Sequence, residues 1–216
     1  MASPGRKPTN RYHHGDLRNA ALAEAIRYVE RSGPESLTLR ALAARLRVTS
    51  TALYRHYASK RDLLAAIAAN GFATLMEAHQ KSELEHRDQP GAWLFAVGID
   101  YVRFALQHPA QFRLMFGDEL RDCAELSELA GVKRASYDAM GRAIRACAEH
   151  NLLGDTPAEE VQLAAWASAH GTAMLLLDGQ IITAAQQRLS EEMLLDHARR
   201  ILAAHGKGML RPHRAA

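Results

Sequence analysis

Side chains that could hydrogen-bond to a nucleic acid recur between residues 37 and 60 of this chain. Hydroxyl, guanidinium and imidazole groups pair with base edges and phosphate oxygens in the major groove of DNA. Here they alternate with apolar residues at helical spacing, which predicts that they face outward from short helices and their caps. The predicted DNA contacts are Thr38, Arg40, Thr49, Ser50, Thr51, Tyr54, Arg55, His56 and Lys60, with Arg11 and Tyr12 upstream.

Two short helices joined by a tight turn are needed to position these side chains. The first is predicted to begin after Thr38, whose hydroxyl can accept from a backbone N–H, and the apolar residues within 39–46 share its inward face. The second is predicted to start with a cap at 49–50, and in it only Leu53 and Tyr57 have core spacing. This pattern is a helix-turn-helix, which points to DNA.

Further segments follow one another in the first third of the chain and extend this pattern: Tyr12–Arg18, Leu37–Ala43, Val48, Leu53–Tyr57 and Ser59–Leu64. Together they resemble the DNA-binding region of the TetR family of transcriptional repressors. The resemblance implies an all-α chain with a three-helix, homeodomain-like DNA-binding domain. It also implies a larger helical domain that binds a ligand and forms a dimer.

Two later segments resemble one branch of the same family. Trp166–Gly171 is similar to the Trp-x-x-x-His-Gly (WHG) signature of a regulatory-domain type found there, and His108–Phe116 also resembles that branch. The regulatory domain is therefore expected to be of the WHG type.

Arg47 departs from the family pattern, because many members have Gly at this position in the turn. A residue with positive φ is common there, and Gly adopts that conformation without steric cost whereas Arg does not. The turn is therefore expected to be either strained or differently shaped. Arg47 is also a candidate phosphate contact.

Charge is distributed unevenly along the 216 residues. Residues 1–60 hold 11 Lys and Arg against 4 Asp and Glu, whereas residues 61–216 hold 16 against 20. A basic segment attracts the phosphate backbone and supplies the salt-sensitive part of DNA affinity. By itself such a segment could equally be an ordinary basic tail.

Size and cysteine content favour a cytoplasmic protein with two domains. A helix-turn-helix with its supporting helix needs only about a quarter of the chain, so a second, larger domain is expected. The sequence has neither an apolar run of about 18 residues nor a charged-then-apolar start, which predicts no membrane span and no signal peptide. Cys123 and Cys147 are expected to be buried thiols rather than a disulfide or metal site. A redox switch between the two cysteines is the alternative.

Hydrophobic periodicity predicts helices throughout and no strand. The expected organisation is a mobile basic arm over 1–16, the helix-turn-helix domain over 17–64 and a regulatory and dimerisation domain over 65–216. The arm could follow a DNA groove or be a disordered tail. A polar linker is expected at 81–90. Helices are predicted at 17–31, 39–46, 50–57, 59–76, 91–107, 112–116, 133–150, 157–178 and 190–205.

The last two predicted helices carry apolar and small residues on more than one side. Packing this pair against its symmetry mate would form a four-helix bundle and a homodimer, a dimer that the family resemblance also implies. The DNA-binding domain of each copy would then contact one half-site of a palindromic operator in double-stranded DNA. The predicted dimer residues are Leu163, Ala167, Gly171, Leu175, Met193, Leu194, His197 and Ile201.

Aromatic and Met residues of the second domain could line an apolar pocket for a small hydrophobic or aromatic effector. Aromatic and Met residues at helical spacing more often belong to the hydrophobic core, so each of these residues is only a candidate for the pocket lining. His170 is more readily a structural residue that hydrogen-bonds across the core or the dimer seam. The pocket candidates are Trp93, Tyr101, Phe104, Phe112, Met115, Phe116, Tyr137, Met140, Trp166, His170 and Met174.

The functional hypothesis is a homodimeric repressor released from DNA by its effector. A transcriptional activator or an architectural DNA binder with the same head remains an alternative. An enzyme is a distant one, because the chain lacks G-x-S-x-G, G-x-G-x-x-G, G-K-[ST], H-E-x-x-H and paired C-x-x-C motifs. His13 and His14 lack a third ligand at workable spacing, so neither a metal nor a cofactor is expected.

Overall fold

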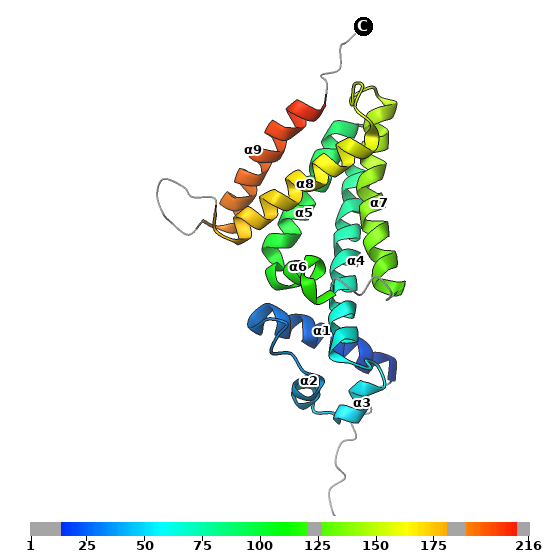
Figure 1. The fold of residues 1–216 in the computed structure, drawn as a ribbon, viewed down its shortest axis with the longest axis vertical. Helices are drawn as coiled ribbons and strands as arrows, with labels where there is room; N and C mark the ends of the chain where they lie inside the picture. Colours follow the sequence, from blue (N-terminus) through cyan, green and yellow to red (C-terminus); the bar gives the residue numbers. More distant parts are fainter. Residues whose placement is uncertain (1–13, 121–126, 181–188, 211–216) are drawn as a thin grey trace, which may run out of the picture. The chain divides into compact units, whose positions relative to one another are not determined.

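Helices make up all the regular secondary structure in the described part of this computed structural model, which comprises residues 14–120, 127–180 and 189–210 (Figure 1). The prediction of an all-α fold is confirmed. The helices are α1 (His14–Ser32), α2 (Leu39–Leu46), α3 (Ser50–Tyr54), α4 (Lys60–His86), α5 (Pro90–Gln107), α6 (Pro109–Phe116), α7 (Ser127–Glu149), α8 (Ala158–Leu177) and α9 (Glu191–Met209). None of these helices is long and apolar enough to cross a membrane.

The chain divides into two compact units, and the division falls after Leu64. It lies inside α4, which begins at Lys60 in the first unit and continues to His86 in the second. One helix therefore contributes residues to both units.

The first unit is held together by a small core between α1, α2 and α3. Val29, Leu37, Leu42 and Leu53 are fully buried in it, and each buried side chain of this size stabilises the fold by about 1.5–3 kcal/mol. The hydroxyl of Tyr57 donates to the backbone carbonyl of Arg18 at 3.1 Å, so the segment after α3 is tied back to α1. The apolar residues of the helix-turn-helix pattern therefore do form the inner face.

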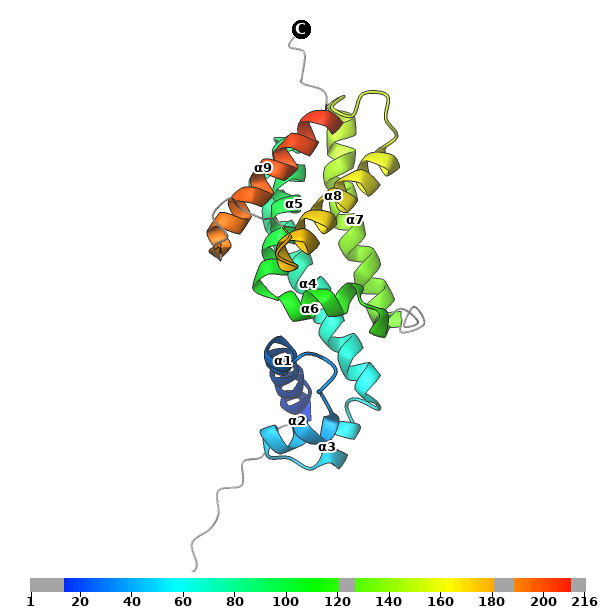
Figure 2. The same ribbon diagram turned by 60° about the vertical axis from the view of Figure 1, so that its left-hand side comes forward.

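Helix α5 is the central element of the second unit (Figure 2). It packs against α6, α7, α8 and α9, and accordingly it is apolar on several faces, with Trp93, Val97, Val102 and Phe104 all buried. A helix surrounded on most sides is expected to carry this continuous apolar pattern. The buried core therefore forms around α5.

The expected linker at 81–90 is wrong for most of its length, because α4 continues to His86 and α5 begins at Pro90. Tertiary contacts explain the polar composition that suggested a linker. The hydroxyl of Ser82 donates to the buried Asp100 carboxylate at 2.5 Å, and Arg142 donates to Glu83 at 2.9 Å. These side chains are polar because they join α4 to α5 and α7.

Helix α7 begins at Ser127, earlier than the predicted start at Lys133. The stretch from 117 to 131 is expected to be less regular with some helix, and it contains the first turns of α7. Leu129 is buried there, which shows that tertiary packing outweighs the local cost of Gly131 in a helix. Residues 121–126, which include Cys123, lie outside the described residues.

Candidate functional site

The turn between α2 and α3 contains Arg47 in the left-handed conformation, with φ 56° and ψ 39°. The N–H of Arg47 donates to the carbonyl of Ala44 at 3.2 Å, and the N–H of Val48 donates to that of Ala43 at 3.0 Å. This is the paired pattern of a Schellman motif, in which Gly is the usual residue at the left-handed position. The turn therefore has the ordinary shape, and Arg47 adopts a conformation that is costly for a residue with a Cβ.

Two threonine hydroxyls cap the helices of this motif. The Oγ1 of Thr38 accepts from the N–H of Ala41 at 3.0 Å, and that of Thr49 accepts from the N–H of Ala52 at 3.3 Å. Both caps confirm the sequence prediction, and each contributes about 1 kcal/mol to its helix. These hydroxyls therefore orient α2 and α3.

Helix α3 ends sooner than predicted, at Tyr54 instead of residue 57. Arg55 and His56 follow in a turn, although the N–H of Tyr57 still reaches the carbonyl of Leu53 at 3.0 Å. The prediction that Arg55 and His56 lie within this helix is therefore wrong. The Ser59 hydroxyl accepts from the N–H of Asp62 at 3.1 Å and caps α4, so the chain must leave α3 before that point.

The remaining polar candidates of the motif face outward or lie at its edge. Tyr54 is 54% exposed although it is aromatic, and Leu53 beside it is fully buried. This division gives α3 one anchoring face and one open face. Of these candidates Arg40, Thr51, Tyr54 and Arg55 are exposed, and Ser50 and His56 are half-buried. Arg11 and Tyr12 lie outside the described residues.

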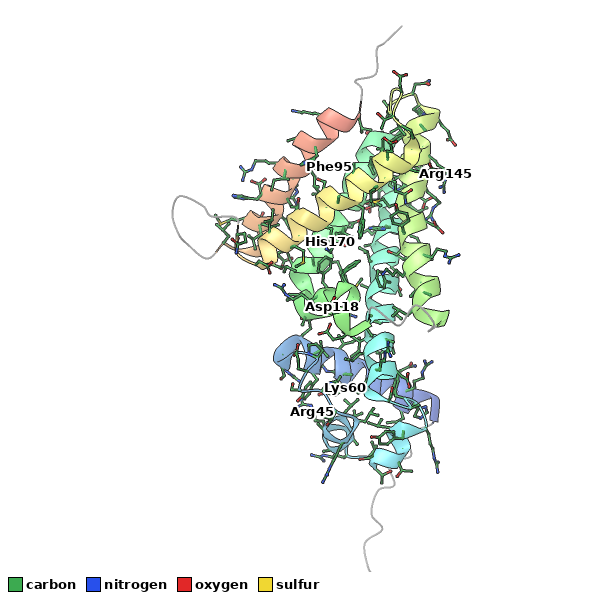
Figure 3. The ribbon with its side chains drawn as sticks, in the orientation of Figure 1. Arg45, Lys60, Phe95, Asp118, Arg145 and His170 are labelled. Atoms are coloured by element: carbon green, nitrogen blue, oxygen red, sulfur yellow. The ribbon has the colours of Figure 1, made fainter. Side chains whose placement is uncertain are left out.

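Lys60 has an internal partner in the first unit (Figure 3). Its Nζ donates to the backbone carbonyl of Glu35 at 2.6 Å, which ties the start of α4 to the loop after α1. The side chain is half-buried as a result. A phosphate contact by Lys60 would have to share or replace this hydrogen bond.

An ion-pair cluster around Glu24 was missed by the sequence reasoning. Its carboxylate accepts from Arg45 at 2.6 Å, from Arg27 at 3.0 Å and from Arg31 at 3.5 Å (Arg45 is labelled in Figure 3). The hydrogen bonds from Arg45 and Arg27 lower the pKa of Glu24. The cluster links α1 to α2, and the helical spacing from Glu24 to Arg27 was the only local signal for it.

A cavity of about 400 Å³ lies within the second unit, between α4, α5, α6, α7 and α8. A smaller space of about 70 Å³ adjoins it, and both are lined by His79, Tyr101, Met140 and Trp166. The larger volume is within the range of about 300–1,000 Å³ that is typical of small-molecule sites. The predicted pocket residues that line the larger cavity are Tyr101, Met115, Phe116, Tyr137, Met140 and Trp166.

The other five pocket candidates line neither cavity. Trp93, Phe104 and Phe112 are buried in the core, while His170 and Met174 are half-buried on α8. Helical spacing could not separate them from the lining residues, because both groups are apolar and inward-facing. Only the packing of the neighbouring helices decides which side chain meets an empty volume.

His170 takes the structural role that the sequence favoured (Figure 3). Its Nδ1 is hydrogen-bonded to the hydroxyl of Tyr101 at 2.8 Å, and its ring packs at centroid distances of 5.0 Å from Phe116 and 5.7 Å from Trp166. Burial lowers the pKa of His170 and raises that of Tyr101. The pair is therefore uncharged at neutral pH and positions Tyr101 beside the cavity.

His79 is the most unusual polar residue of the cavity, and the sequence reasoning did not identify it. It is only 4% exposed, and neither ring nitrogen has a hydrogen-bond partner within the described residues. Burial lowers its pKa to about 4; the Val97 backbone acts against this lowering, and the positive charge of Arg142 adds to it. A buried imidazole without a partner is costly, so its retention beside a cavity needs an explanation.

Small and apolar residues form an exposed stripe along α8. Leu163, Ala167, Gly171 and Leu175 recur every fourth position, and Leu163 and Leu175 are 56% and 49% exposed. A Cβ added at Gly171 would meet nothing within 4 Å. On α9, Met193 is 49% exposed, whereas Leu194, His197 and Ile201 are half-buried.

The remaining cysteine prediction concerns Cys147, which is buried in the core beside Trp93 and Ile144. Burial raises the pKa of its thiol to about 11, so the thiol is protonated at neutral pH and unreactive. No group of three or more His, Cys, Asp or Glu side chains among the described residues is arranged to hold a metal ion.

Family models match both units of the chain. Residues 21–67 match the model described as bacterial regulatory proteins, tetR family, and residues 94–198 match the one described as tetracyclin repressor-like, C-terminal domain. This protein belongs to the TetR family. It is a DNA-binding transcriptional regulator and not an enzyme. No curated protein matches this TetR family chain in sequence.

Solved structures share the fold of this TetR family protein. A Rhodococcus sp. RHA1 protein of unknown function is 28% identical with a TM-score of 0.78, over 94% of this chain and 100% of that one. A tetR family regulatory protein from Rhodococcus RHA1 is 20% identical with a TM-score of 0.67, over 89% and 96%. The TetR family regulator PfmR from Thermus thermophilus is 17% identical with a TM-score of 0.62, over 85% and 97%.

Proposed function

We propose that this TetR family regulator is a homodimeric repressor that binds a palindromic operator and is released by a small apolar effector. The observation that carries the proposal is that the chain pairs a helix-turn-helix with a cavity of about 400 Å³ in its second unit. A regulator that only bound DNA would not need an open volume in its core, where close packing is the rule.

The DNA contacts are assigned to the polar residues around α3. Thr51, Tyr54 and Arg55 are exposed, whereas Leu53 and Tyr57 anchor the same segment in the core. Arg40 and Arg47 are also exposed and suit phosphate contacts. Because the proposed partner is double-stranded DNA, we expect the protein to act in the cytoplasm.

The dimer is assigned to α8 and α9, which pack against each other within the chain. The four-residue repeat of small and apolar side chains on α8 would allow close approach to the same stripe of a second copy. A twofold arrangement buries both stripes and presents two heads, as a palindromic site requires.

The regulatory unit is assigned to the WHG type on the basis of Trp166, His170 and Gly171. Trp166 lines the cavity, and His170 lies one turn further along α8 with its ring 5.7 Å from that of Trp166. His170 in turn hydrogen-bonds Tyr101, so the motif links α8 to the central helix α5.

Effector release is assigned to a population shift between DNA-competent and DNA-incompetent forms. An effector that binds the incompetent form more tightly lowers operator affinity tenfold for each ~1.4 kcal/mol of differential binding. Helix α4 is the proposed coupling element, because it contributes Lys60 to the first unit and Phe72 and His79 to the cavity. Effector binding that leaves both the operator affinity and the spacing of the two DNA-binding domains unchanged would rule this mechanism out.

The test is a fluorescence-anisotropy titration of the purified protein with DNA flanking its own gene, against scrambled DNA, at two salt concentrations. A preference for the flanking DNA that survives higher salt supports a specific regulator. Equal and steeply salt-dependent binding to both DNAs would contradict an operator in that region. Gene deletion then separates the modes of action, because loss of a repressor raises target transcription and loss of an activator lowers it.

A further inference from the structure

Two cations and one histidine line the cavity of the second unit, and they differ in exposure. Lys133 and Arg134 on α7 line the cavity and are exposed, so they are at its open side. His79 on α4 also lines it but is 4% exposed, so it is at the closed side. The rest of the lining is mostly apolar, with Phe72, Phe116, Leu120, Leu129 and Met140, and it also includes the hydroxyl-bearing residues Tyr101, Ser136 and Tyr137.

The separation between the two polar positions follows from the helices that carry them. Helices α4 and α7 run in the same direction (Figures 1 and 2), and Arg142 on α7 donates to Glu83 on α4 at 2.9 Å. By this pairing His79, which is four residues before Glu83, lies level with residue 138 of α7, four residues beyond Arg134. Four residues of α-helix rise by about 6 Å, so a ligand that meets both positions must extend along the helices.

Among the described residues that line the cavity, the charged side chains are all cations. The two cations Lys133 and Arg134 are the charged members of its described lining, which includes no carboxylate. Burial holds the imidazole of His79 in its neutral form, in which one ring nitrogen donates and the other accepts a hydrogen bond. The open side thus favours an anion, and the closed side favours an uncharged hydroxyl or carbonyl group.

We propose that this cavity binds an elongated apolar carboxylic acid, with its carboxylate at Lys133 and Arg134 and an uncharged hydrogen-bonding group at the unpartnered imidazole of His79. This inference rests on the proposed function, because it assigns a ligand class to the cavity described there. It also explains why a buried histidine lacks a partner in the described residues, since the ligand supplies one.

Direct calorimetric titration of the full chain tests the ligand class without DNA. The probes are decanoate, 1-decanol and decylamine, which share an apolar chain and differ in charge, together with 10-hydroxydecanoate. We expect decanoate to bind up to about tenfold more tightly than the alcohol, and the amine to bind most weakly. The hydroxy acid is expected to bind more tightly than decanoate, because its hydroxyl reaches His79. Alcohol binding equal to that of decanoate, or no acid binding at all, overturns the proposal.

Variants assign the two polar positions. Lys133→Gln combined with Arg134→Gln is expected to weaken decanoate binding about tenfold and leave 1-decanol unchanged. The matched control is Lys81→Gln with Arg145→Gln, which removes two exposed cations outside the cavity (Arg145 is labelled in Figure 3) and should change neither. An equal loss of decanoate affinity in both double variants would show that only the net charge of the protein matters, and it would overturn the assignment.

His79→Phe is expected to abolish the advantage of 10-hydroxydecanoate over decanoate while decanoate itself still binds. If this variant fails to fold, the comparison of the two acids on the unmodified protein carries the same test. A hydroxy acid that binds no better than decanoate means that His79 meets only water, and the second contact of the proposal is then wrong.

An operator titration with and without the acid separates this inference from the proposed function. An acid that binds but leaves operator affinity unchanged supports the ligand class and contradicts effector release. Release by a compound of another charge class, with no binding of acids, supports effector release and overturns the ligand class.

Discussion

The two units of this TetR family protein place their polar side chains in opposite ways. In the first, Tyr54 and Arg55 are exposed, and the side-chain caps of Thr38 and Thr49 orient α2 and α3. In the second, His79 and Tyr101 are buried and face a cavity enclosed by helices distant in sequence. A surface that meets DNA can be specified by local structure, whereas an internal site requires long-range packing.

The largest effect is expected from a substitution in the small core of the first unit, which tests how far the stability of the protein depends on that core. Leu53→Ala removes a fully buried side chain from α3 and should destabilise the protein by about 2–5 kcal/mol, because it leaves a cavity that few neighbours can fill. Urea unfolding followed by circular dichroism measures the loss. Leu84→Ala is the control, since Leu84 is 73% exposed and its truncation should change stability by about 0.5 kcal/mol or less.

The pH dependence of stability tests the buried histidine of the second unit. The pKa of His79 is lowered to about 4 by burial, so below pH 6.5 the unfolded chain binds a proton that the folded chain does not. This residue should therefore reduce stability as the pH falls from about 6.5 to about 4, by roughly 3 kcal/mol over the whole range.

Urea unfolding at several pH values measures this effect, and His79→Phe should flatten the slope between those two pH values. The exposed residue His150 supplies the control, because His150→Gln should leave the slope as it is. An unchanged slope in His79→Phe would show that the imidazole has access to water or a partner in the folded protein.

An intermediate effect is expected at the outward face of the first unit. Arg55→Ala should weaken operator binding by about 1–3 kcal/mol and leave random DNA nearly unaffected if the guanidinium contacts bases. Anisotropy titrations with both DNAs make the distinction. The control Arg145→Ala removes an exposed cation from α7 and should alter neither affinity. Equal losses on both DNAs for Arg55→Ala would assign it to phosphate instead.

The smallest expected effect concerns the turn of the first unit. Arg47→Gly relieves a left-handed conformation at φ 56° and should stabilise the protein by about 1 kcal/mol. Thermal unfolding measures the gain. Asn151→Gly is a matched control at φ 57°, where a smaller gain is expected because Asn tolerates this conformation better than Arg. A loss of operator binding in Arg47→Gly without loss of stability would indicate that the guanidinium contacts DNA.

Local features were the most predictable part of the fold. The caps at Thr38 and Thr49 follow from hydroxyl chemistry at a helix start, and the positive φ at Arg47 follows from the tight turn. The short length of α3 was not predicted, because the apolar spacing continues to Tyr57 although the helix ends at Tyr54. Residues 81–86 were misassigned for the converse reason, since their polar side chains serve contacts with distant helices.

The candidate cavity was predictable only in composition. Aromatic and Met residues on the inner faces of helices were identified, but Phe112 proved to be core and Phe116 proved to line the cavity, although they lie on the same short helix. His79 was not identified, because a single His in a long helix resembles any surface residue until its burial is known. The Glu24 cluster was missed since Arg45 meets it only when α2 packs on α1.

The sequence by itself determined the helical class of this protein, its helix-turn-helix and its family resemblance, because these depend on residue spacing, caps and turn chemistry within a few neighbours. Only the tertiary structure decided which apolar residues of the second unit enclose a volume and which buried polar group is left without a partner. The physical reason is that packing is collective: whether a side chain such as His79 meets protein or empty space depends on helices that the local sequence does not describe.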